Sequence, residues 1–130
     1  MLNPKQTLSV GALLGALGVA LGAFGAHALK PTLLANQSLE TYELAVRYQF
    51  YHAFALLIIG LLMEKIESKT LVSAATCTVA GVVLFSGSLY ALAFETGKAM
   101  AFVTPIGGVF LLIGWVLLLI SVVKRTTKKP

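Results

Sequence analysis

The sequence predicts an all-α membrane protein, a four-helix transmembrane bundle with antiparallel up-down-up-down topology. The first observation is composition: 58% of the 130 residues are hydrophobic and only 12% are charged, whereas about a quarter of the residues in soluble domains are charged. The second is a series of long uncharged stretches, each able to cross the ~30 Å hydrocarbon layer as a helix. The third is that short polar turns separate these stretches. We therefore expect a single membrane domain over residues 1–130.

The expected helices cover about residues 7–29, 39–63, 70–94 and 99–123. The first, third and fourth carry no Asp, Glu, Lys or Arg, whereas the second has Arg47 in its first half. We still interpret the second as a span, because with three spans the polar turn at 64–69 would face the wrong side of the membrane. The last helix has an alternative start at Thr104, since threonine caps helices and proline, here Pro105, is favoured at the first helical position.

The distribution of cations predicts the orientation of the helices. Four spans place seven cations on one side of the membrane: Lys5, Lys65, Lys69, Lys124, Arg125, Lys128 and Lys129. Lys30, Arg47 and Lys98 fall on the other side. Cytoplasmic loops are enriched in Lys and Arg, so we expect both termini in the cytoplasm. The net charge of +5 then reflects topology, and we expect the lipid bilayer, not nucleic acid, as partner.

Tyrosines give a second indication of depth. Tyr42, Tyr48, Tyr51 and Tyr90 all map toward the predicted outer ends of their helices. Amphipathic aromatic rings are enriched at membrane–water interfaces. We therefore expect these rings at the outer headgroup level.

A stripe of glycines follows one face of the first predicted helix. Its members alternate by four and three residues: Gly11, Gly15, Gly18, Gly22 and Gly25. In lipid, faces without side chains let helix backbones approach closely and gain dispersion contacts. The stripe predicts helix packing, either inside the bundle or between the subunits of a homo-oligomer.

The second predicted helix carries the main candidates for a binding site. Glu43 and Arg47 are four residues apart, in the favourable order for an ion pair, and Tyr51 and His52 follow on nearby faces. With His27 from the end of the first helix, they would form an outer polar pocket for an anion, a proton or a lipid headgroup. The alternative is a sealed, hydrogen-bonded clasp. If the last helix begins at Thr104, its free N–H groups would add a second anion-binding element.

Other polar residues are expected to serve packing. Ser86 and Ser88 can bond across helices or to their own helix, and Trp115 lies so deep that its indole N–H should find a partner inside the bundle. Two histidines without metal-ligand spacing do not predict a metal or cofactor site, and no catalytic constellation is present. We expect no cofactor and no enzymatic activity.

Five segments resemble a known family: Gly22–His27, Arg47–Ala53, Phe85–Tyr90, Thr104–Gly108 and Gly114–Trp115. They are similar to the YgdD/YwdK-like family of small bacterial inner-membrane proteins, a domain of unknown function with animal transmembrane relatives. The resemblance covers nearly the whole chain. It implies four transmembrane helices in the bacterial inner (plasma) membrane and no established activity.

Three functional hypotheses follow. The leading one is a non-enzymatic homo-oligomer that binds lipid or stabilises a membrane complex, because small residues abound and catalytic spacing is absent. The alternative is a small transporter or a proton- or ion-conducting subunit that uses the polar cluster at Arg47, Tyr51 and His52. A haem or quinone enzyme would require His27 and His52 to converge.

Overall fold

The computed structural model describes residues 1–124, which form five helices. Their bounds are α1 (Pro4–Ala26), α2 (Lys30–Ala35), α3 (Leu39–Lys65), α4 (Lys69–Ala93) and α5 (Met100–Val123). All except the short α2 are long and apolar enough to cross a membrane. The predicted cytoplasmic cations Arg125, Lys128 and Lys129 lie outside the described residues.

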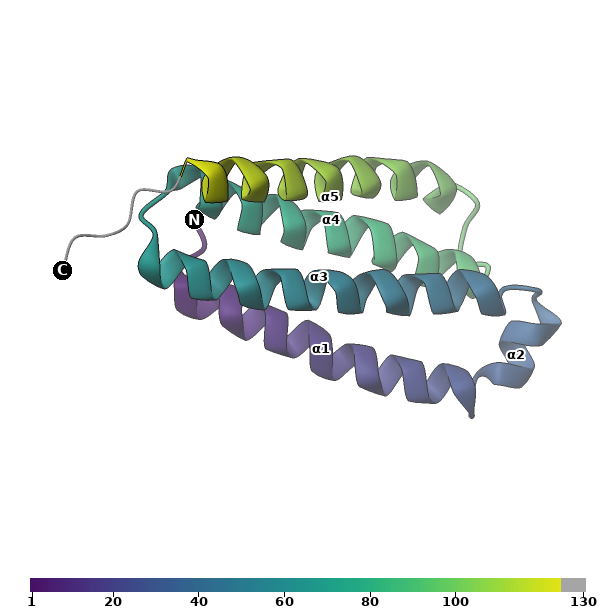
Figure 1. Cartoon of the computed structure of the whole chain (residues 1–130). Helices are drawn as coiled ribbons and strands as arrows, with labels where there is room; N and C mark the ends of the chain where they lie inside the picture. The colour runs from purple at the N-terminus through teal and green to yellow at the C-terminus, as the bar shows by residue number, and fades with distance from the viewer. Residues whose placement is uncertain (125–130) are drawn as a thin grey trace.

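The four long helices lie side by side in a row that follows the order of the sequence (Figure 1). α1 packs on α3, α3 on α4, and α4 on α5. Neighbouring long helices run in opposite directions, and the N-terminus and the end of α5 lie at the same end of the molecule (Figure 1). The row differs from a closed bundle, in which the first and last helices would also pack together. Lipid solvates the outer helices, so no hydrophobic force closes the row.

Small residues create the contact between α1 and α3. A methyl group on Gly25 would overlap the ring of Tyr42, and one on Gly18 would come within 2.9 Å of the ring of Phe50. Gly11 and Gly22 also face α3, whereas a methyl group on Gly15 would have no neighbour within 4 Å. Four of the five glycines of the stripe therefore pack inside the chain, and Gly15 alone among them has an open Cβ position.

A second set of glycines brings α4 and α5 together. A methyl group on Gly107 would overlap the backbone of Phe85, and one on Gly114 would lie 2.6 Å from Oγ1 of Thr78. Such close approach of two backbones suits helix association in lipid, where dispersion and hydrogen bonds replace the hydrophobic effect.

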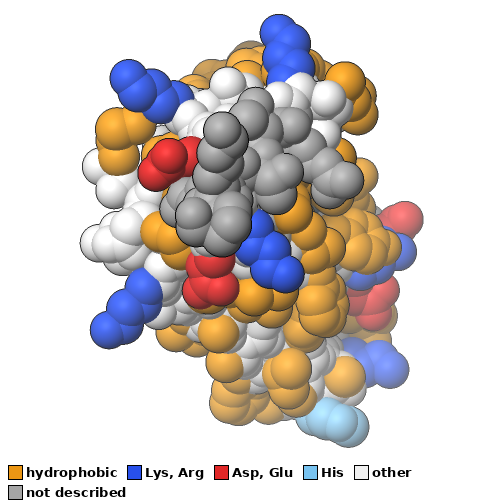
Figure 2. All heavy atoms as spheres, turned by 60° about the vertical axis from the view of Figure 1, so that its left-hand side comes forward, with side chains coloured by type: hydrophobic (Ala, Val, Ile, Leu, Met, Phe, Trp, Pro, Cys, Tyr) orange, Lys and Arg blue, Asp and Glu red, His pale blue; other side chains and the backbone are white. Residues whose placement is uncertain are grey.

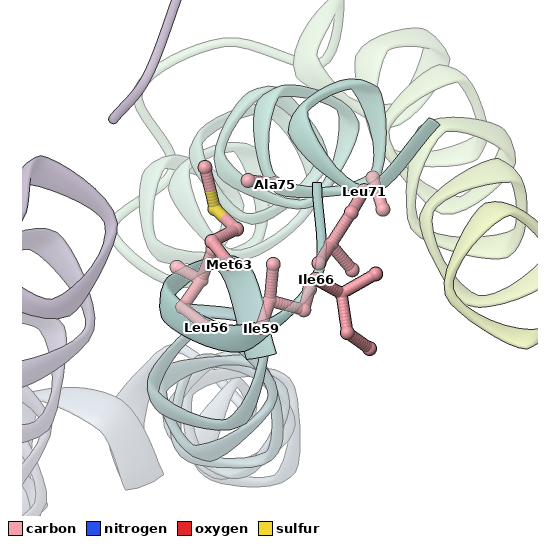
Figure 3. Close-up of a cluster of buried hydrophobic side chains, with 7 residues drawn as sticks. Leu56, Ile59, Met63, Ile66, Leu71 and Ala75 are labelled. Atoms are coloured by element: carbon pink, nitrogen blue, oxygen red, sulfur yellow. The ribbon is translucent and has the colours of Figure 1, made fainter. Parts of the chain in front are cut away.

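Large apolar side chains fill the space between α3 and α4 near the end that carries the termini (Figure 3). This buried cluster consists of Leu56, Ile59, Met63, Ile66, Leu71, Ala74 and Ala75. Figure 2 turns the same end toward the viewer: Lys, Arg, Asp and Glu side chains stand around it, while the receding flank is largely hydrophobic. The charged end and the apolar flank match the boundary between water and lipid.

The connection between α1 and α3 contains the short helix α2. α1 ends at Ala26, and Pro31 lies in the first turn of α2, where its missing N–H is not needed. Ser38 is the N-cap residue of α3, but its hydroxyl makes no capping bond and instead donates to the carbonyl of Ala93 at 2.7 Å. The residue therefore ties the start of α3 to the end of α4.

The alternative start of the last helix at Thr104 is wrong. α5 begins at Met100 and contains Pro105 in its interior. Three short-range bonds, including Met100 N–H to the carbonyl of Gly97 at 3.1 Å, begin the helix one turn before the proline. Proline cannot donate to the carbonyl four residues earlier, but this is a single loss near the helix start, where packing on α4 holds the turn.

Candidate functional site

The predicted polar cluster is divided between two sides of α3. Glu43 and Arg47 border a hollow of about 210 Å³ on the side of α1. Tyr51 and His52 line a larger groove on the side of α5. Positions 47 and 52 differ by about 140° around a helix, so one pocket cannot readily take both side chains. His27 is an exposed cap residue at the end of α1 and lines neither space.

Arg47 forms no ion pair with Glu43, although their spacing favours one; among residues 1–124 neither side chain has a hydrogen-bond or ion-pair partner. Both residues are exposed. The hollow beside them is bordered by Gly22 and Gly25 of α1, which contribute no side chains. The Arg47 side chain is therefore free to extend along the hollow toward the outer surface, as long cationic side chains of membrane helices do.

His52 is buried and fully hydrogen-bonded. Its Nδ1 lies 2.7 Å from the carbonyl oxygen of Tyr48, and the indole N–H of Trp115 donates to its Nε2 over 3.1 Å. Because the carbonyl can only accept, Nδ1 carries the proton and Nε2 accepts from the indole. The imidazole is thus a neutral bridge between α3 and α5. The expectation that the deep Trp115 bonds inside the chain is confirmed.

This bonding pattern bears on metal and haem chemistry. A metal or a proton at Nε2 of His52 would have to displace the bond from Trp115. Within residues 1–124, no group of three or more His, Cys, Asp or Glu side chains is placed to hold a metal ion.

A groove of about 580 Å³ lies between α3 and α5, beside the His52–Trp115 bond. Besides His52, four aromatic side chains line it: Tyr48, Tyr51, Phe85 and Trp115. The rings of Tyr48 and Phe85 are 4.7 Å apart, and those of Tyr48 and Tyr51 are 5.7 Å apart. On the α5 side, Gly108 leaves space where a side chain would stand. The volume falls in the range of small-molecule sites, about 300–1,000 Å³.

The tyrosines fall into two pairs. The hydroxyl of Tyr42 donates to the carbonyl of Leu21, and that of Tyr90 donates to Oε1 of Gln49 at 2.8 Å. Within the described residues, the hydroxyls of Tyr48 and Tyr51 have no hydrogen-bond partner. The two tyrosines without partners are the two that line the groove.

Gln49 is a central residue that the sequence patterns did not single out. It is 4% exposed, its side-chain N–H donates to the carbonyl of Leu14 at 2.8 Å, and its oxygen accepts from Tyr90. It therefore joins α1, α3 and α4. A lone amide within an apolar helix was the available signal, because buried polar groups in lipid must be paired.

Hydroxyl groups of α4 and α5 serve packing. Ser86 donates to the carbonyl of Ala45 on α3 at 2.8 Å, and Ser88 is 2.6 Å from the hydroxyl of Thr104. Both predicted bonding modes of the serines are confirmed, since Ser88 also donates to the carbonyl of Phe85 on its own helix. Thr104 lies inside α5 and bonds to α4, so it does not form the predicted anion-binding helix terminus.

Four long apolar helices, with paired polar groups between them and an aromatic groove on one side, define a multi-span membrane protein. The chain belongs to the family described as "Protein of unknown function (DUF423)", which matches residues 21–108. The family resemblance inferred from the sequence motifs is confirmed.

Relatives of similar length carry membrane-protein names. A UPF0382 membrane protein of Staphylococcus aureus is 41% identical, over 92% of this chain and 97% of its own length. The UPF0382 membrane protein YwdK of Bacillus subtilis is 36% identical, over 92% and 98%. The UPF0382 inner membrane protein YgdD of Escherichia coli is 39% identical, over 98% and 96%. No solved structure gave a significant match.

Proposed function

We propose that this chain is a non-enzymatic, lipid-binding protein of the bacterial inner membrane. It crosses the membrane four times in an up-down-up-down arrangement, with both termini in the cytoplasm. The cations Lys5, Lys65, Lys69 and Lys124 support this orientation, because the positive-inside rule places such residues on the cytoplasmic side. The inner-membrane name of the Escherichia coli relative supports the location.

The observation that carries the lipid-binding proposal is the groove between α3 and α5. Its walls are mainly apolar and aromatic, and it opens at the flank of the row, where lipid surrounds the protein. α3 and α5 both pack on α4, and the His52–Trp115 bond joins them directly. A membrane amphiphile can enter such a groove sideways and fill a space that no side chain of residues 1–124 fills.

Conduction of protons or ions has less support. His52, the ionisable group nearest the centre of α3, has both nitrogens engaged, and Arg47 and His27 do not join it. An oligomer is compatible with lipid binding. It would have to use a face other than the glycine stripe, because Gly11, Gly18, Gly22 and Gly25 face α3.

Substitution of Gly108 tests the proposal. A methyl group there would be in ordinary contact with the ring of Phe85, 3.7 Å away, so a leucine can be placed with its end in the groove. We expect the wild-type protein, extracted in mild detergent, to retain lipid in native mass spectra. Gly108→Leu should lose most of that lipid.

Gly15→Leu is the matched control, because Gly15 lies on α1 and has no atom within 4 Å of its Cβ position. It should retain lipid like the wild type. Equal lipid retention by all three proteins, each with native helix content, would rule out the groove as the binding site.

A further inference from the structure

The groove lies near the middle of the membrane-spanning layer. The uncharged stretch of α1, between Lys5 and Lys30, is centred near Leu17. The next residue, Gly18, packs against the ring of Phe50 on α3. Seen from α1, the centre of the layer is therefore level with Phe50, one residue before Tyr51.

The register of α4 gives the same level. Its uncharged stretch is centred near Val82. Ser86 bonds to the carbonyl of Ala45, and the two helices run in opposite directions, so Val82 is level with Gln49 of α3. In addition, His52 is the central residue of α3 itself, equally far along the helix from both ends.

This depth differs from the outer headgroup level expected from the sequence, and it leaves the hydroxyls of Tyr48 and Tyr51 far from water. The boundary of the hydrocarbon lies about 15 Å from its centre. The side chain of Tyr51 begins within a turn of that centre, and it is too short to bring its hydroxyl to water. A polar group without a partner in hydrocarbon costs several kcal/mol in general. Tyr51 lines the groove and is 56% exposed, so a molecule bound in the groove can supply the missing partner.

We propose that the groove binds a lipid-soluble quinone, with a ring carbonyl accepting hydrogen bonds from Tyr51 and Tyr48. This inference rests on the proposed function and names the ligand class for the same groove. His52 offers no free donor, because its Nδ1–H is engaged by the Tyr48 carbonyl, so the phenols are the donors that remain. The rings of Phe85 and Trp115 provide flat surfaces on which a quinone ring can stack.

Other occupants satisfy these groups less well. Phospholipid acyl chains have no polar atoms near the centre of the bilayer, so they would fill the groove and leave both phenols unpaired. A helix of a second copy would offer carbonyls that can accept a further hydrogen bond, as those of Leu14 and Leu21 do here, but no planar ring to stack on Phe85 and Trp115. A quinone combines an apolar tail, a planar ring and exposed carbonyl acceptors in one lipid-soluble molecule.

The only tryptophan of the chain, Trp115, lines the groove and reports on its contents. The protein is placed in phospholipid nanodiscs and titrated with decylubiquinone, while tryptophan fluorescence is recorded. We expect saturable quenching in the wild type and in Gly15→Leu. Tyr51→Phe should weaken the apparent affinity about 3- to 10-fold, which corresponds to one hydrogen bond. Gly108→Leu should leave only the linear, collisional quenching.

Decylbenzene, which has a ring and tail but no carbonyl, is the matched probe and should not compete with decylubiquinone. Linear quenching in the wild type, or equal affinity of wild type and Tyr51→Phe, would overturn the assignment of a quinone. If Gly108→Leu still loses co-purified lipid in that case, the lipid-binding proposal stands and only the ligand class is wrong. If lipid retention is also unchanged, both proposals fail.

Discussion

The indole N–H of Trp115 on α5 donates to Nε2 of His52 on α3 over 3.1 Å, and this bond joins two helices that otherwise meet mainly through α4. It fixes the tautomer of the imidazole, because Nδ1 is engaged by the carbonyl of Tyr48. It also sets one wall of the groove. The groove and the bond are thus parts of the same arrangement.

Loss of this bond should loosen α5. Trp115→Phe leaves Nε2 of His52 buried without a donor, and we expect a loss of about 0.6–1.7 kcal/mol in the free energy of unfolding, as for hydrogen bonds between membrane helices. Denaturation in mixed micelles, followed by circular dichroism, measures the change. In a His52→Phe background, Trp115→Phe should lower the free energy of unfolding measurably less. Equal costs in the two backgrounds would show that the residues are not coupled.

Gln49 and Tyr90 should behave as a coupled pair. Gln49→Leu removes the acceptor of the Tyr90 hydroxyl and leaves that group unpaired, so it should destabilise the protein by about 1–3 kcal/mol. Adding Tyr90→Phe removes the orphaned hydroxyl and should restore part of the lost stability. A double variant less stable than Gln49→Leu would contradict the bond of 2.8 Å seen between these side chains.

The glycines of α1 should differ in their tolerance of a methyl group. Gly25→Ala forces its Cβ into the ring of Tyr42, and overpacking of this kind typically costs about 1–3 kcal/mol. Gly15→Ala meets no atom within 4 Å and should leave stability unchanged or slightly raised. Thermal denaturation in detergent compares the two variants. Similar melting temperatures would mean that the stripe does not contact α3 as described.

Arg47 should draw the headgroup of an anionic phospholipid into the hollow beside α1, because its side chain begins about one turn outward of the centre of the layer and the bilayer can thin locally around such a charge. The guanidinium has no ion-pair partner among the described residues, and an uncompensated charge at a span centre costs about 2.5–3.5 kcal/mol on insertion scales. We expect Arg47→Ala to retain less anionic lipid than wild type when equal mixtures of phosphatidylglycerol and phosphatidylcholine are offered. Glu43→Ala should retain at least as much. Equal retention of anionic lipid by Arg47→Ala and the wild type would show that no headgroup binds in the hollow beside α1.

The orientation is testable with reporter fusions. Green fluorescent protein fused after the last residue should fluoresce, because it folds in the cytoplasm, and alkaline phosphatase at the same point should be inactive. A phosphatase fusion at Gly97, between α4 and α5, should be active on the outer side. The opposite pattern at both points would invert the topology inferred from the cations.

Much of the fold follows directly from the sequence. The uncharged stretches predict four spanning helices, and their predicted bounds fall within a few residues of α1, α3, α4 and α5. The sequence also predicts that Trp115 and the serines form hydrogen bonds inside the chain, because a deep indole or hydroxyl must be paired where water is absent. The thickness of the bilayer sets the length of a spanning helix, and a polar group in hydrocarbon can bond only to another group of the protein. Both features can therefore be read from short stretches of sequence.

The tertiary structure alone decided how the polar residues are distributed. The sequence places Arg47, Tyr51 and His52 close together along α3, but five residues of helix turn Arg47 and His52 toward different neighbours. Which neighbour lies on each side depends on the packing of the glycines of α1 against α3 and of Gly107 and Gly114 against α4. Lipid provides no hydrophobic force that would assign one helix to another, so shape complementarity between faces sets the arrangement. The groove with its two unpaired phenols is a result of that packing.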